Sequence, residues 1–220
     1  MLAISGAPIA SLNAVISPSL APNPDEIASL AASESPWEVP WSIHIRGVPG
    51  PLITEVAASY GLTIFNTQPL MVRRPDQGLP PEPAIDSLRV RAVPVDEFDL
   101  YARTVAEGFE VPHEMFQVLT EPSLDKIDGM TFYLAELDGV PVGTGMTVIS
   151  GDLTGIFNIT TLPPYRRRGY GKAVTMEMVR AGFAAGASTA YLYASKMGEP
   201  VYQSAGFQTE ENLTVITAPS

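Results

Sequence analysis

The chain has 220 residues, 45% of them hydrophobic, which is enough for one large domain or two small ones with packed cores. Its 24 acidic residues outweigh 13 basic ones, and a net charge of -11 argues against nucleic acid or anionic lipid as a partner. Without cysteine the chain forms no disulfide bond or thiolate metal site, and without a membrane-length apolar run or a signal peptide it is expected to be cytoplasmic, with no membrane partner.

The first part of the chain, up to about residue 79, is rich in proline and shows a short α/β pattern. Trp37 and Trp41 in this part are expected to lie in a core or an interface. The predicted elements are helices at residues 25–32 and 51–59 and strands at residues 11–16, 41–46 and 70–72.

Residues 74–83 (RPDQGLPPEP) contain four prolines and one glycine without a periodic apolar pattern, which is typical of a linker. We therefore predict an N-terminal domain over residues 1–79, a linker over 80–85 and a second domain over 86–220. The first domain holds only three of the 13 basic residues and no cluster that resembles a catalytic site, so the chemistry is expected in the second domain.

The second domain begins with an alternating strand at residues 88–93 and a helix at residues 96–108, which ends at Gly108. Further along, Asp138-Gly139 predicts the turn of a β-hairpin. The remaining predicted elements are, in order, a helix at 113–119, strands at 130–136, 140–149 and 156–161, a helix at 168–186, a strand at 190–194, a helix at 198–205 and a strand at 207–217.

Residues 166–172 (RRRGYGK), between the predicted strand at 156–161 and the next helix, carry the wrong charge for a helix start. Aligned peptide dipoles place about half a positive charge at a helix N-terminus, which favours Asp or Glu there. Three arginines and a lysine are explained if an anion binds, because the first-turn amides point at it and Gly169 and Gly171 let the backbone come close. We predict a phosphate or pyrophosphate site, and the alternative is a solvated basic cluster.

The pattern R-x-x-G-x-G, which starts at Arg166, resembles the cofactor loop of the GNAT superfamily of N-acetyltransferases. Residues 202–207 (YQSAGF) resemble a second motif of that family, Y-x-x-x-G-F. The element order after residue 86 is that of a GNAT domain, and the first part resembles the degenerate half-domain that precedes it in some bacterial members. The resemblance implies an α/β fold of the α+β type, with a mixed, mostly antiparallel sheet flanked by helices and a smaller N-terminal α/β half-domain.

The resemblance also implies acetyl-coenzyme A as the cofactor, with its pyrophosphate in the 166–172 loop and its pantetheine arm along the preceding strand. A backbone amide near Thr161, where the strands at 156–161 and 190–194 part, would polarise the thioester carbonyl. Ser195 stands where related enzymes often carry Asn. The implied cofactor contacts are Ile159, Thr160, Thr161, Arg166, Arg167, Arg168, Gly169, Tyr170, Gly171, Lys172 and Ser195.

Acetyl transfer to an amine needs a neutral amine and a proton for the departing thiolate. Tyr202, in the second motif, is the candidate acid, since a phenol with a pKa of about 10 stays protonated at neutral pH; packing of its ring on the sheet is the alternative. Glu110 is the candidate base, because its loop borders the acceptor site in the family and the strand at 190–194 lacks the carboxylate of many relatives. The alternatives to Glu110 are a chain of water molecules, Glu107, Glu114 and His113.

We predict an enzyme that moves the acetyl group of acetyl-coenzyme A to a primary amine, on a small molecule or a peptide, by direct attack. The acidic surface would attract such a cationic acceptor. The alternative is a non-catalytic module that binds or senses an acyl-coenzyme A. No metal site is expected, because His44 and His113 stand alone, and the sequence leaves a monomer and a homodimer open.

Overall fold

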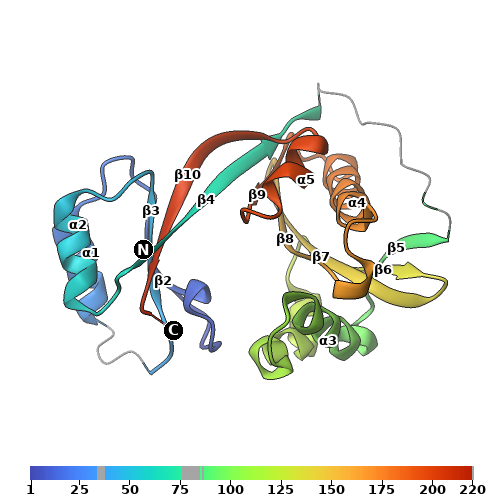
Figure 1. Ribbon diagram of the computed structural model, residues 1–220, viewed down its shortest axis with the longest axis horizontal. Coiled ribbons are helices and arrows are strands. Elements are labelled where there is room, and N and C mark those ends of the chain that lie inside the picture. The colour runs from blue at the N-terminus through green and yellow to red at the C-terminus, as the bar shows by residue number, and fades with distance from the viewer. Residues whose placement is uncertain (34–37, 76–84, 86, 220) are drawn as a thin grey trace. The chain divides into compact units, whose positions relative to one another are not determined.

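The computed structural model describes residues 1–33, 38–75, 85 and 87–219 of the chain (Figure 1). Its contacts divide the chain into two compact units, Met1–Leu70 with Thr209–Ser220 (unit 1) and Met71–Gln208 (unit 2). Trp37 and most of the predicted linker lie outside the described residues. Over the described part of the chain, every helix is too short or too polar to span a bilayer.

Unit 1 packs two helices against a small sheet. Strands β2 and β3 pair in parallel, whereas β1 pairs antiparallel with β2 and β10 antiparallel with β3. Ile27 and Ile53, one from each helix, pack with Ile43 and Ile216 of the strands, and Trp41 is buried edge-on to a tyrosine ring. The elements are β1 (Leu2–Ile4), β2 (Asn13–Ser17), α1 (Pro24–Ser33), β3 (Ser42–Arg46), α2 (Pro51–Ser59) and β10 (Gln208–Thr217); β4 (Ile64–Arg73) crosses the division between the units.

Unit 2 is built on the strand order β9-β8-β7-β6-β5, in which only β8 and β9 pair in parallel. Together with unit 1 this confirms the predicted fold class, a mixed and mostly antiparallel arrangement with flanking helices. The strands are β5 (Leu88–Ala92), β6 (Met130–Leu137), β7 (Val140–Ser150), β8 (Leu153–Thr161) and β9 (Thr189–Tyr193). The helices are α3 (Phe98–Phe109), α4 (Tyr170–Ala184), α5 (Glu199–Ser204) and the 3₁₀ helices η3 (Val95–Glu97), η4 (His113–Thr120), η5 (Pro122–Lys126) and η6 (Pro163–Tyr165).

The sheet of unit 2 is buried on both faces, as alternation along β6 shows. Phe132 and Leu134 point to one face and pack with Tyr101 of α3, whereas Tyr133 and Ala135 point to the other face and pack in the cluster that contains α4. Figure 1 shows α3 and α4 next to the central strands of this unit. A strand that is apolar on both sides needs a helix on each side, so β6 sits between two helical layers.

Local backbone geometry changes the end of one predicted helix, the start of another and the type of a third. The helix predicted to stop at Gly108 continues to Phe109 and is capped by Glu110 in the left-handed conformation. The helix predicted from residue 168 begins at Tyr170, because Gly169 has a φ of 85° and cannot be helical there. The segment predicted as a helix at 113–119 forms the 3₁₀ helix η4.

The last strand belongs to unit 1 from Thr209 onward. In the β3–β10 pairing Leu213 lies opposite Arg46, and the Arg46 guanidinium donates to Glu211 Oε2 from Nε at 2.9 Å and from Nη2 at 2.6 Å. The predicted domain over residues 86–220 placed this strand in the second domain. The structure differs because alternation identifies a strand but not the strand with which it pairs.

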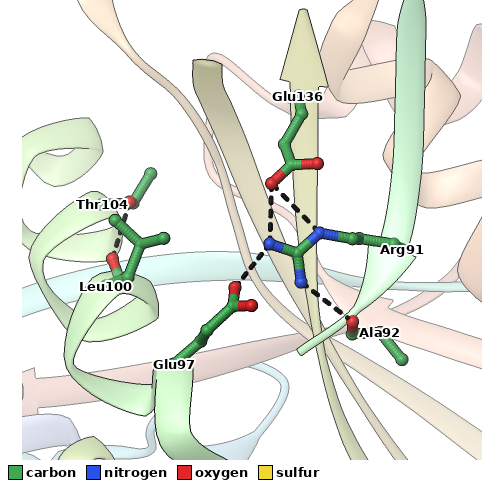
Figure 2. Close-up of polar contacts among 6 residues, drawn as sticks. All are labelled: Arg91, Ala92, Glu97, Leu100, Thr104 and Glu136. Atoms are coloured by element: carbon green, nitrogen blue, oxygen red, sulfur yellow. Dashed lines mark hydrogen bonds and ion pairs between the residues drawn. The ribbon is translucent and has the colours of Figure 1, made fainter. Parts of the chain in front are cut away.

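An arginine with two carboxylate partners holds the start of α3 to the sheet (Figure 2). Arg91 of β5 donates to Glu136 Oε1 of β6 from Nε at 3.0 Å and from Nη2 at 2.7 Å, and Nη2 also donates to Glu97 of η3. The hydrogen bond to Glu136, and to a smaller extent that to Glu97, raises the pKa of Arg91, so the guanidinium stays protonated. The side chain of Glu136 is only 12% exposed, so loss of Arg91 would leave a mostly buried carboxylate without its cation.

We expect Arg91→Met to lower the free energy of unfolding by about 1–3 kcal/mol, because it leaves two carboxylates without their cation. Urea unfolding of the whole chain measures the change. Arg103→Met is the matched control, since Arg103 pairs with Asp99 on the exposed side of α3 and such a pair contributes about 0.5 kcal/mol or less. Equal effects of the two variants would contradict the assignment.

Candidate functional site

The basic loop between β8 and α4 turns through two left-handed residues. Pro163 and Pro164 follow β8 in η6, and Arg167 and Gly169 then take φ values of 64° and 85°. Gly169 is the N-cap residue of α4 and has no side chain with which to cap the helix. The amides at the start of an α-helix have no partner within the helix, so those of α4 are available to a ligand.

Gly171 is not required by the fold. It lies in the first turn of α4, and a Cβ atom there would meet only Thr161 Oγ1 at 3.5 Å, an ordinary contact. Gly169 differs, because its φ of 85° demands glycine. A glycine in a helix without a conformational or packing reason costs stability, which is consistent with space kept open for a ligand.

Two of the four cations in the loop bind carbonyl groups of α3, β8 and α5. The Nζ of Lys172 donates to Ser204 O at 2.6 Å, which links the first turn of α4 to the end of α5. The guanidinium of Arg166 donates from Nε to Thr161 O at 3.1 Å and from Nη2 to Gly108 O at 2.8 Å. These two side chains therefore hold the loop in place.

The other two cations are exposed. Among the described residues, Arg168 makes a single long hydrogen bond, from Nη2 to Pro164 O at 3.3 Å, and its guanidinium carbon lies 5.8 Å from the centre of the Tyr165 ring. Arg167 makes no hydrogen bond or ion pair with any described residue. Arg167 and Arg168 are thus the cations of the loop that can meet an anion without giving up a strong contact.

Strand β8 bends and then parts from its neighbour. Its register with β9 runs from Leu153 to Gly155, whereas β8 itself continues to Thr161. Asn158 takes a left-handed φ of 50° at a bulge, where the register with β7 shifts, and its carbonyl accepts from Thr144 Oγ1 at 2.8 Å. A bulge increases bending and twist, and residues 156–161 extend past the pairing with β9.

The predicted pantetheine-lining residues differ in accessibility. Ile159 and Thr161 are half-buried, but Thr160 is buried with its side chain under α3. A Cβ on Gly108 would lie 2.3 Å from Thr160 Oγ1, so the end of α3 rests directly on this residue. From the sequence, Gly108 was interpreted only as the stop of a helix, and its close packing on Thr160 was not predicted. The one local sign of such packing is a glycine near the end of an amphipathic helix.

The helix α5, which carries Tyr202, is linked to the loop at its end. The Tyr202 side chain is in the core cluster, 8% exposed, with Phe207 edge-on at 6.2 Å. Burial raises the pKa of Tyr202 to about 12, so the phenol holds its proton far above neutral pH. The Lys172–Ser204 contact joins the helix that carries Tyr202 to the basic loop, so the two sequence motifs meet in space.

Glu110, the predicted base, forms an ion pair. Its carboxylate lies 2.8 Å from Arg166 Nη1, and its side chain is 62% exposed. Among the alternatives, Glu107 and Glu114 are exposed and His113 Nε2 lies 3.7 Å from Asp99. The structure thus places Glu110 beside the loop, where its carboxylate is paired with the Arg166 guanidinium.

Ser195 lies just after β9 and is exposed. Its Oγ accepts a hydrogen bond from Gly198 N at 3.1 Å, which stabilises the start of α5. Within the described residues, His, Asp and Glu side chains form no group of three that could hold a metal ion. The candidate site is therefore the start of α4, the end of β8 and the helix of Tyr202.

Comparisons with known proteins bear on this site. The sequence profile of the acetyltransferase (GNAT) family matches residues 98–207, which is half of the chain, with the N-terminal region before it. The fold is similar to that of a GCN5-related N-acetyltransferase from Kribbella flavida (TM-score 0.70, 20% identity, 97% of this chain and 84% of that one). It is also similar to a GCN5-related N-acetyltransferase from Sphaerobacter thermophilus (TM-score 0.62, 18% identity, 87% of this chain and 64% of that one). No curated protein matches the chain.

Proposed function

Because this chain belongs to the GNAT acetyltransferase family, we propose that it transfers the acetyl group of acetyl-coenzyme A to a primary amine by direct attack. The family implies acetyl-coenzyme A-dependent acyltransferase activity, and the acceptor and the catalytic residues are our proposal. The observation that carries it is the uncapped, basic start of α4 with an open Gly171, joined by Lys172 to the helix of Tyr202.

The start of α4 would hold the pyrophosphate of the cofactor. Arg167 and Arg168 supply exposed positive charge, and the first-turn amides add donors and the positive end of the helix dipole. The pantetheine arm would run beside residues 156–161, where β8 extends past its pairing with β9 and can offer backbone groups to an extended ligand. A backbone amide near Thr161 would then polarise the thioester carbonyl.

In the reaction the amine nitrogen bonds to the carbonyl carbon of the thioester, and the bond from that carbon to sulfur breaks. The sulfur leaves with the electron pair and takes a proton from the Tyr202 hydroxyl, which burial keeps protonated, and the resulting phenolate regains a proton from solvent. The amine loses one proton, to solvent or to a base, and only a small neutral fraction is needed for attack. Glu110 as that base stays a prediction, and its ion pair with Arg166 favours another role.

Release of coenzyme A thiol from acetyl-coenzyme A tests the function. We would assay the full chain with aminoglycosides, polyamines, a peptide with a free N-terminus and small amino compounds, since all carry the cationic amine that an acidic protein attracts. Amine-dependent thiol release with an acetylated product supports the proposal. Lack of coenzyme A binding would contradict it.

The second candidate is a non-catalytic module that binds or senses an acyl-coenzyme A. One observation favours it, because β9 reads Thr-Ala-Tyr-Leu-Tyr and so offers no carboxylate beside the splayed strand. Saturable binding of acetyl-coenzyme A, with no thiol release for any amine in the panel, would support this module over the enzyme.

The pH profile should show no loss of activity at alkaline pH. Since burial raises the pKa of Tyr202 to about 12, the acid is protonated below that value and would lose its proton only above it. We expect kcat/KM to rise with pH as the amine loses its proton and then to stay level up to at least about pH 10. A fall between pH 8 and 10, with the fold intact by circular dichroism, would contradict the role of Tyr202.

A further inference from the structure

The side chain of Arg166 joins three acceptors from two separate elements. Its Nε donates to Thr161 O of β8 at 3.1 Å, its Nη2 to Gly108 O of α3 at 2.8 Å, and its Nη1 lies 2.8 Å from Glu110 Oε2. A guanidinium is a planar fork with five donors, so one side chain can hold three acceptors in a fixed geometry. An amine such as that of lysine offers no such fork.

We propose that Arg166 and Glu110 form a positioning pair, which sets the end of α3 against the end of β8, and that Glu110 is the counterion of Arg166 and not the general base. The geometry of the pair is independent of any reaction. Its effect on catalysis rests on the proposed function, because β8 is then the strand beside which the thioester lies.

Because α3 and β8 pack closely beside this pair, a change in the position of Arg166 would affect both elements. Gly108 leaves no space for a Cβ above Thr160, so the backbone of α3 meets β8 directly. The C-terminal carbonyls of a helix carry partial negative charge, and the Arg166 guanidinium is placed where it stabilises them. A shift of Arg166 would therefore move Thr161 and the end of α3 relative to each other.

The backbone conformation of Glu110 supports a role for this residue as the partner of Arg166. Glu110 is the C-cap residue of α3 with φ 58° and ψ 41°, the left-handed conformation in which glycine is strongly preferred. A residue with a Cβ is strained in that conformation, and the carboxylate offsets the strain through its contact with Arg166. Glutamate at this position is explained by that contact without any proton transfer.

Four variants separate positioning from base catalysis. Glu110→Gln keeps an oxygen that accepts from Arg166 but cannot take a proton. Glu110→Gly suits the left-handed backbone and removes the contact. Arg166→Met removes all three contacts, and Arg166→Lys restores one donor at most. Asp99→Asn is the matched control, because it loses a carboxylate whose ion pair with Arg103 lies on the same helix.

Amide hydrogen exchange in the full chain, without any ligand, tests the pair directly. The Glu110 and Val111 amides donate to Glu107 O and Ala106 O at the end of α3. We expect Arg166→Met to speed their exchange about tenfold or more, Glu110→Gly to speed it less than Arg166→Met because glycine suits the left-handed backbone, Glu110→Gln about threefold or less, and Asp99→Asn not at all. Unchanged exchange in Arg166→Met would overturn the inference, whether or not the protein proves to be an acetyltransferase.

Kinetics with acetyl-coenzyme A and the best amine of the panel give the second readout. Positioning predicts that Glu110→Gln keeps kcat within about threefold with the wild-type pH profile, whereas Arg166→Met lowers kcat/KM about 10- to 100-fold. A loss of 100-fold or more in Glu110→Gln, together with loss of the acid limb of the profile, would make Glu110 the base and overturn the inference. Absence of turnover in the wild type would contradict the proposed function alone, and the exchange measurement would still decide the pair.

Discussion

Gly171→Asp is expected to abolish coenzyme A binding and to stabilise the free protein. The new carboxylate would lie in the first turn of α4, where it suits the helix dipole and the neighbouring cations, and the fold has space for its Cβ. A negative charge at the proposed pyrophosphate position replaces attraction with repulsion, so affinity should fall at least about 100-fold. The free protein should gain up to about 1 kcal/mol, because glycine is a poor helix former.

Thermal unfolding with and without coenzyme A measures both effects in one experiment. The melting temperature of Gly171→Asp should exceed that of wild type without ligand, and coenzyme A should raise it only in the wild type. Gly171→Ala is the control for space alone, with a similar gain in stability and a smaller loss of affinity. Coenzyme A binding equal to wild type in Gly171→Asp would contradict the loop assignment.

Tyr202→Phe is expected to lower kcat about 100-fold and to change the affinity for acetyl-coenzyme A by less than about threefold. The substitution removes the proton donor but keeps the ring that packs with Phe207 in the core. General acid catalysis contributes about 10²- to 10⁴-fold, and the lower end is expected if water can replace the phenol. Stopped assays of thiol release give kcat, and calorimetry gives the affinity.

Tyr133→Phe controls for the loss of a buried hydroxyl. Tyr133 lies on β6 in the same core cluster, and burial raises its pKa as it does that of Tyr202. We expect its kcat to stay within about threefold of wild type. If Tyr202→Phe behaves in the same way, Tyr202 is a packing residue and the thiolate takes its proton from solvent.

Several features could be predicted from the sequence because their causes are local. The helix α2 was predicted at residues 51–59, where the structure has it, since a proline at its start and a glycine just after its end lie close together in the sequence. The hairpin between β6 and β7 follows from Asp138-Gly139, whose residues both take positive φ. The anion site at the start of α4 could be predicted because the helix dipole and the basic residues that oppose it belong to the same short segment of the chain.

The partners of the loop cations, in contrast, were decided by the tertiary structure. Arg166 bonds to Gly108, 58 residues earlier, and Lys172 to Ser204, 32 residues later. Both contacts depend on how a helix packs against a strand or a second helix, and no local pattern specifies that distance. All four cations were therefore predicted to bind the anion, whereas in the structure Arg166 and Lys172 bind backbone carbonyl groups of other elements.

The sequence by itself determined most of the elements of unit 2, their order and the place of the two motifs, because spacing, turn chemistry and helix-end charge act within a few residues. Only the tertiary structure decided that β10 pairs with β3, that Thr160 lies beneath Gly108 and that Glu110 meets Arg166. These features depend on contacts between segments far apart in the chain. Hydrophobic alternation identifies the buried face of an element but does not specify which other element packs against it.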